Sequence, residues 1–156
     1  MAQFETDDAA IRDMIHQLSA ADLFTEESQE RILKAGAQTL ADAEARAARG
    51  RHRRTGVMAE HVTVAKKIRE DKYGYLYATV TVSGSVTRGK KRKIRTRNAV
   101  KAFVNNYGRR SRGAIPASHF WTQAAENSRS QCTQTMQEEV NALLKGKEQS
   151  KCLSLI

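Results

Sequence analysis

The chain has little of several residue types, and each shortage excludes a class of protein. Its 156 residues include only two cysteines, one proline and 6% aromatic side chains. Cys132 and Cys152 lie far apart with no metal-ligand spacing, which excludes a disulfide-rich secreted scaffold, and we expect free thiols in a reducing compartment. The low aromatic content predicts a modest core, although the length suffices for one domain that folds without disulfides or metal.

Long apolar runs are missing as well. No run approaches the ~20 residues that cross a bilayer, so we expect no membrane partner. The first ten residues are acidic and lack the basic and apolar regions of a secretory signal. We therefore expect the protein to be made in a cytoplasm.

The usual sequence patterns of catalysis and cofactor binding do not occur. There is no glycine-rich phosphate loop, HExxH, CxxC or serine nucleophile elbow. The four histidines are scattered, and Glu138 and Glu139 are adjacent on a predicted helix, where neighbours point in different directions. The sequence thus predicts no catalytic residue, no metal and no cofactor. A small basic enzyme, such as a nuclease, is an alternative that the missing His/Glu grouping counts against.

Positive charge is abundant and unevenly placed. Fifteen of the 27 lysines and arginines lie in residues 46–54, 88–97 and 109–112, while residues 1–30 hold eight acids and one arginine. This segregation suits contact with a polyanion and head-to-tail self-association equally well. The candidate residues for an interface or a DNA channel are Arg51, Arg53, Arg54, Lys90, Lys91, Arg92, Lys93, Arg95, Arg97, Arg109, Arg110 and Arg112.

The segment "RGKKRKIRTR" (88–97) leaves three interpretations open: a solvated loop, a contact with an acidic protein surface, or a contact with nucleic acid. Aromatic residues interleaved with the cations would favour nucleic acid. The tyrosines at 73, 75 and 77 lie instead in a predicted strand, where they could form a stacking platform for bases, although such a strand face more often forms core or subunit contacts. No helix-turn-helix, zinc-finger or RNP signature is present.

Apolar spacing predicts three helices. The first covers 8–20, and the second runs from an N-cap at Thr25 to a stop at Gly50, with Gly36 allowing close approach. The third runs from about residue 117, after Pro116, to about 145, with Gly146 as its end. A tail over 146–156 follows, and its apolar residues are expected to dock on a neighbouring subunit: Leu153, Leu155 and Ile156.

Between the helices the pattern changes to alternation rich in Val, Thr and Tyr. The pattern predicts an antiparallel pair of strands over residues 57–68 and 73–86. The basic segment that follows is predicted to be a long loop or a hairpin tip. Residues 98–108 fit either a strand or a short helical turn. We therefore predict one α+β domain over 1–145, with a small antiparallel sheet of about three or four strands packed by long N- and C-terminal helices.

The order of these parts resembles a known family. A long helix ends in "ARAARGRHRRTG", a hairpin follows, and then comes "AVKAFVNNYGRRSRGAIPASHFWTQAAENS". In this order the sequence resembles the small head–tail joining and tail-completion proteins of long-tailed bacteriophages, over roughly residues 30–145. The resemblance implies an "RRTG" turn at 53–56, a strand at 102–108 and a helix start at 115–117. The chain departs from the family in two places: Ser118-His119 stands where the family commonly has Arg-Pro, and the basic connection at 88–97 is longer.

This resemblance implies a structural virion protein of the phage neck or head-proximal tail end, without catalysis. Such subunits assemble into a homo-oligomeric ring, commonly hexameric, which joins the tail to the head connector and surrounds the DNA. The implied partners are copies of the chain, other neck and tail proteins, and DNA in the channel. The alternative is a free-standing basic nucleic-acid-binding protein.

Overall fold

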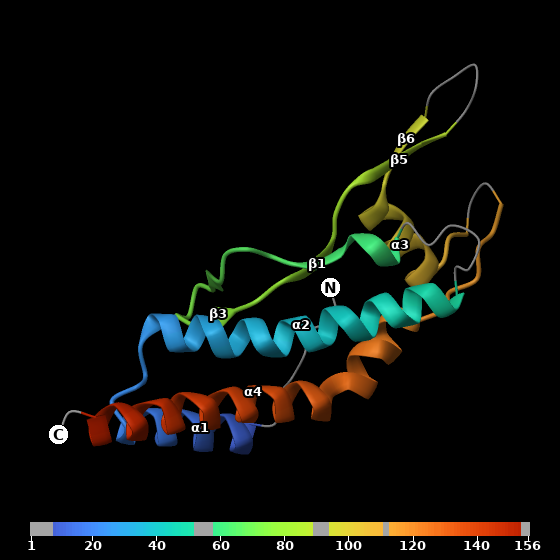
Figure 1. Ribbon diagram of the computed structural model, residues 1–156. Helices are drawn as coiled ribbons and strands as arrows, with labels where there is room; N and C mark the ends of the chain where they lie inside the picture. The colour runs from blue at the N-terminus through green and yellow to red at the C-terminus, as the bar shows by residue number, and fades with distance from the viewer. Residues whose placement is uncertain (1–7, 52–57, 89–93, 111–112, 154–156) are drawn as a thin grey trace.

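The computed structural model describes residues 8–51, 58–88, 94–110 and 113–153 and has the predicted α+β class. The long helices pack against each other, and a β ribbon lies on the opposite side of α2 from α1 and α4 (Figure 1). In this part of the chain the helices are α1 (Asp8–Ala20), α2 (Glu26–Arg51), α3 (Asn98–Tyr107) and α4 (Phe120–Leu153). α2 is thus the central layer.

The described strands form three two-stranded antiparallel ladders that are not joined into one sheet. The ladders are β1 (Val62–Val64) with β4 (Val80–Val82), β2 (Arg69–Glu70) with β3 (Leu76–Tyr77), and β5 (Ser85–Arg88) with β6 (Ile94–Arg97). The first two are successive parts of the hairpin predicted over 57–86, and a short 3-10 helix (Ala59–His61) precedes β1. The third carries the basic segment, whose tip at 89–93 lies outside the described residues. Of the two alternatives for that segment, the hairpin is therefore confirmed.

The corner between α1 and α2 is set by local capping. Asp22 adopts a left-handed φ of 53°, and the Leu23 N–H donates to the Leu18 carbonyl at 2.8 Å, which closes α1 in a Schellman motif. The predicted N-cap at Thr25 is confirmed, because its Oγ1 accepts the Ser28 N–H at 3.3 Å while Ser28 Oγ accepts the Thr25 N–H at 3.0 Å. These bonds fix how α2 leaves the turn.

The interior consists of two separate apolar cores. One lies between α1 and the adjoining ends of α2 and α4, and its buried members are Met14, Leu18, Ile32 and Val140. The other lies where α2 meets the β ribbon and α3, and its buried members are Ala48, Met58, Ala59, Val82, Ala102 and Phe120. Each core is small, in line with the few aromatic residues.

A seam of close contacts between α2 and α4 connects the two cores. A Cβ on Gly36 would come within 2.9 Å of the Met136 side chain, so the predicted close approach at this glycine is confirmed. Across the same seam, Thr39 and Thr135 share a hydrogen bond of 3.2 Å. Close packing of small residues lets the two helices approach each other closely where they cross.

Two predicted helix ends are wrong. Gly50 lies inside α2, and Gly146 lies inside α4, so residues 147–153 of the expected tail are helical. Neither glycine has the positive φ of a C-terminal cap. A glycine within a helix costs only about 1 kcal/mol relative to alanine, which the packing of a long helix overrides.

The predicted start of the last helix is also wrong, since α4 begins at Phe120 and not after Pro116. His119 precedes it with a left-handed φ of 47°. The Trp121 N–H, in the first turn, donates at 2.9 Å to Oδ1 of Asn106, which lies on α3. The cap of α4 therefore comes from another helix and is not visible in the local sequence.

The strand that the resemblance implies at 102–108 is a helix, α3. Helical spacing places Asn98, Ala102 and Asn106, each four residues after the last, on one buried face. The strand at this place is therefore corrected, and the helical alternative holds.

Candidate interaction surfaces

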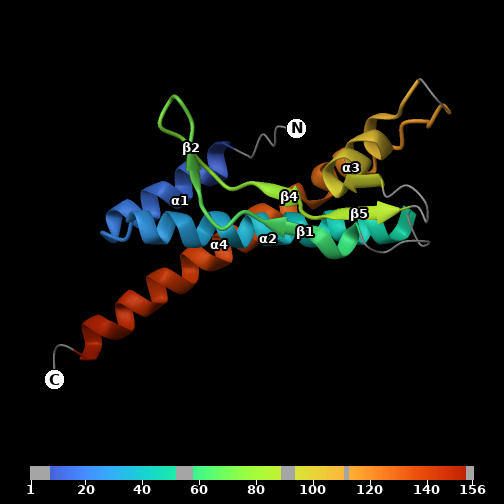
Figure 2. The ribbon, with the colours of Figure 1, turned by 90° about the horizontal axis from the view of Figure 1, so that it is seen from above.

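The strands β5 and β6, the helix α3 and the segment after α3 lie at one end of the molecule (Figures 1 and 2), and the described cations of this end are Arg95, Arg97, Lys101, Arg109 and Arg110. Arg95 and Arg97 point to the same face of their ladder because they are two residues apart, and both are exposed. Arg95 Nε donates to Ser85 Oγ at 2.7 Å, which holds one guanidinium against the ladder. Among the described residues no carboxylate pairs with Arg95 or Arg97. We call this region the basic end.

A surface hollow of about 560 Å³ lies beside these arginines. Its lining residues are Val82, Gly84, Ser85, Arg95, Arg97 and Ala99. The hollow is cationic on one side, so it suits a carboxylate or a phosphate better than a neutral group.

Only part of the predicted cationic set can be placed. Arg95, Arg97, Arg109 and Arg110 lie at the basic end, and Arg109 Nη2 donates to the Gly113 carbonyl at 3.2 Å. Two predicted residues have a described backbone only, at the ends of their helices: Arg51 and Leu153. The others lie outside the described residues: Arg53, Arg54, Lys90, Lys91, Arg92, Lys93, Arg112, Leu155 and Ile156. The docking of the tail therefore stays a prediction.

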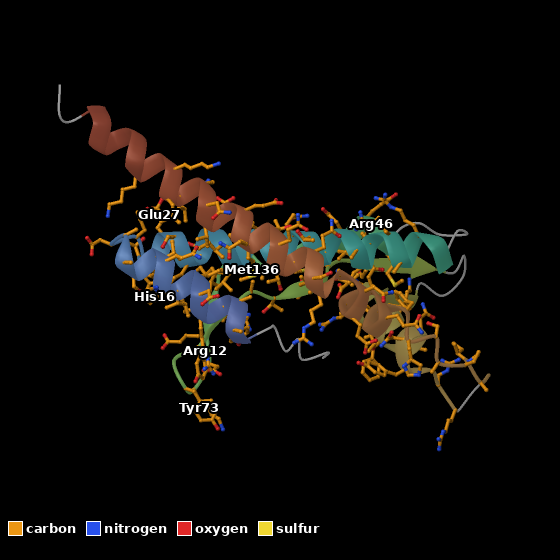
Figure 3. All side chains as sticks on the ribbon, turned by 90° about the horizontal axis from the view of Figure 1, so that it is seen from below. Arg12, His16, Glu27, Arg46, Tyr73 and Met136 are labelled. Carbon is orange, nitrogen blue, oxygen red and sulfur yellow. The ribbon has the colours of Figure 1, made fainter. Side chains whose placement is uncertain are left out.

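The other end of the molecule carries a cluster of exposed carboxylates, and Lys145 and Lys147 of α4 lie at the same end. The segment 22–27 connects α1 to α2 and presents Asp22, Glu26 and Glu27, all exposed. Asp22 is 95% exposed and lies 3.9 Å from Lys147, a weak ion pair, and Phe24 between the acids is 43% exposed. We call segment 22–27 the acidic corner. Glu27 and Arg46 lie near opposite ends of α2 in Figure 3, and α2 spans roughly 40 Å at ~1.5 Å per residue.

Sequence reasoning missed a row of exposed apolar residues on α3. Val100, Phe103 and Tyr107 are 51%, 59% and 43% exposed. The rings of Phe103 and Tyr107 lie 4.9 Å apart, so the row is continuous. The spacing of three and four residues is visible in the sequence, but it fits either a strand or a short helical turn over residues 98–108 and predicts no exposed face. We call these three residues the α3 stripe.

The tyrosines expected in a buried or paired strand face are instead exposed at the turn between β2 and β3. Tyr73 and Tyr75 are 70% and 71% exposed, and Tyr73 projects beyond the helices (Figure 3). Asp71 Oδ1 accepts the N–H groups of both tyrosines, at 2.8 and 3.0 Å. Lys72 Nζ lies 4.6 Å from the centre of the Tyr73 ring. The turn is thus ordered and displays two rings.

Two titratable groups are strongly affected by burial. Glu44 on α2 is only 7% exposed, its Oε2 has no hydrogen-bond partner among the described residues, and burial raises its pKa to about 8. Burial also raises the pKa of the free Cys132 thiol on α4. Within the described ranges, no three His, Cys, Asp or Glu side chains gather as metal ligands. No helix in the same ranges is both long and apolar enough for a membrane span.

Comparisons with protein-family models, curated proteins and solved structures gave no match to this chain.

Proposed function

We propose that the chain is a structural subunit of a bacteriophage particle. It assembles into a ring at the neck or the head-proximal end of the tail and joins the tail to the head connector around the DNA. The observation that carries the proposal is the polarity of the molecule: one end presents arginines, the other presents carboxylates, and each end exposes apolar side chains. The order of sequence parts described above supports the same conclusion.

Opposite surfaces at opposite ends favour heterologous contacts. A contact between unlike surfaces leaves one surface free on each copy, so it repeats until a ring closes or a filament grows. The arginines at the basic end then contact either the carboxylates of a neighbouring subunit or the DNA that passes through the ring. Both roles are structural, and neither requires turnover of a substrate.

The test is a change of charge in the β5–β6 hairpin during particle assembly. We expect the variant with Arg92, Lys93, Arg95 and Arg97 all replaced by Ser to fold but to leave heads and tails unjoined, as counted by electron microscopy. The control removes four exposed cations elsewhere: Lys66, Lys67, Arg69 and Lys72. Normal infectious particles from the first variant, or absence of the chain from purified particles, would refute the proposal.

A second candidate function is binding of single-stranded nucleic acid, and the turn between β2 and β3 favours it. Tyr73 and Tyr75 stand exposed beside the four cations of the control variant, an arrangement suited to base stacking and phosphate contact. Tight binding of an oligonucleotide at ~150 mM salt, with a steep fall in affinity as salt rises, would support this candidate. The variant Tyr73→Leu/Tyr75→Leu should then lose about 1–3 kcal/mol of binding free energy per stacked base. Affinity that does not change with these substitutions would exclude the turn.

A further inference from the structure

The polarity of α3 is the reverse of an ordinary surface helix. Its buried residues include two asparagines, Asn98 at 1% and Asn106 at 2% exposure, whereas its exposed residues include the α3 stripe. Surface helices normally bury the apolar face and expose the amides. Together the three residues of the stripe expose roughly 300 Å² of mainly apolar surface, a size typical of binding patches.

Hydrogen bonds hold α3 in this orientation. Asn98 Nδ2 donates to the Ser83 carbonyl at 2.9 Å, and Asn106 Oδ1 accepts the Trp121 N–H at 2.9 Å. Rotating α3 to bury the stripe would break both bonds and take the two amides away from the Ser83 carbonyl and the Trp121 N–H, which is unfavourable. The bonds at both ends of α3 therefore keep the stripe on the surface of the molecule.

The charges around the stripe indicate the chemistry of its partner. Arg95 and Arg97 precede α3, Lys101 lies on it, and Arg109 and Arg110 follow it. A complementary surface has an apolar centre flanked by carboxylates, which would face Arg95, Arg97, Lys101 and Arg110. The acidic corner has this composition, with Phe24 between Asp22 and the two glutamates.

We infer that the α3 stripe of one copy binds the acidic corner of a second copy. Phe24 packs against Phe103 and Tyr107, and Glu26 and Glu27 face the arginines of the basic end. The two surfaces lie at opposite ends of the molecule (Figures 1 and 2), so the contact is heterologous and repeats around a ring. This inference rests on the proposed function for the ring, but purified protein suffices to test it.

The experiment uses two variants of the full chain, each with one surface removed. The stripe variant is Phe103→Asp/Tyr107→Ser, and the corner variant is Phe24→Ser/Glu26→Lys/Glu27→Lys. All five side chains are exposed, and circular dichroism and thermal unfolding check that both variants fold. Mass photometry and sedimentation then measure the size of each protein alone and of their 1:1 mixture.

We expect the wild type to form closed oligomers and each variant alone to be monomeric. The mixture should stop at a heterodimer, since the stripe variant keeps its corner and the corner variant keeps its stripe. Adding Arg95→Glu/Arg97→Glu to the corner variant should lower the dissociation constant for self-assembly at least tenfold relative to the corner variant, because the exchanged charges attract each other again. A control with Lys66→Ser/Lys67→Ser should assemble like the wild type.

Three results would overturn the inference: a wild type that stays monomeric at ~100 µM, a mixture that does not pair, or a corner variant that dimerises through its own stripe. The proposed function fails separately, because it requires the chain in purified particles. If purified particles contain the chain but the two variants do not pair, the inference about these two surfaces is wrong, and the proposed function is not refuted. Rings in solution with no chain in particles would refute the function alone.

Discussion

Glu44 gives the sharpest test of the packing between the two cores. The carboxyl lies on the face of α2 that also buries Ala41 and Ala48, and it is 7% exposed. Burial raises the pKa of Glu44 from 4.5 to about 8. The folded chain therefore holds a proton that the unfolded chain releases between these two pH values.

The sign of the effect follows from proton linkage. Because the folded state binds the extra proton, the contribution of Glu44 to stability is most favourable below pH 4.5 and falls as pH rises towards 8, by about 1.4 kcal/mol per pH unit. Glutamine has nearly the same shape and cannot ionise. Glu44→Gln should therefore match the wild type near pH 4 and be more stable by roughly 4 kcal/mol at pH 7.5.

The measurement is urea unfolding of both proteins from pH 4 to 8.5, at low protein concentration. The control is Glu126→Gln on α4, where the glutamate is exposed, and its difference from the wild type should stay within about 0.5 kcal/mol at every pH. If the Glu44→Gln difference does not change with pH, then the carboxylate is solvated in the folded chain and the reasoning from burial is wrong.

Two further predictions concern the junction of α3 with α4. Asn106→Ala removes the acceptor for the Trp121 N–H and should lower the unfolding free energy by about 1–3 kcal/mol. Asn106→Asp keeps the acceptor and should lower it less. Equal losses for the two variants in chemical denaturation would show that Asn106 does not cap α4. Gly108→Ala should cost about 3 kcal/mol, because φ is 79° and the new Cβ would lie 2.8 Å from the Ile115 carbonyl oxygen. Gly113→Ala, with φ of 81° but only an ordinary contact of 3.9 Å between the new Cβ and Arg109 Nη2, should cost only about 1 kcal/mol in the same assay. Equal costs of the two substitutions would exclude the clash at Gly108.

The helices whose ends depend on local chemistry could be predicted from the sequence. α1 has one apolar row, and α2 begins at a threonine whose partner, Ser28, lies three residues away. Both signals depend on residues that lie close together in the sequence, so these helix boundaries can be predicted without knowing the rest of the fold. The prediction that α2 ends at Gly50 failed because the helix end there depends on packing elsewhere in the fold. An exposed glycine without a left-handed φ does not stop such a helix.

The candidate site was predicted less completely. The positions of the arginines predicted the basic end, but the spacing of Val100, Phe103 and Tyr107 did not decide between a strand and a helix or predict which face is exposed. The direction of α3 depends on partners that lie far away in sequence, namely the Ser83 carbonyl and the Trp121 N–H. Neither amphipathic periodicity nor composition reveals which face such distant bonds select.

The division of the interior into two cores has a consequence for how the molecule opens. Within the part of the chain that the structure describes, the two cores share no buried apolar residue, and we therefore expect each core to open without the other. Native-state hydrogen exchange should then find two cooperative units, one protecting the amides of α1 and the other those of α3 and β4. Within the proposed ring, such a molecule would adjust one extremity to a mismatched neighbour while the other stays folded.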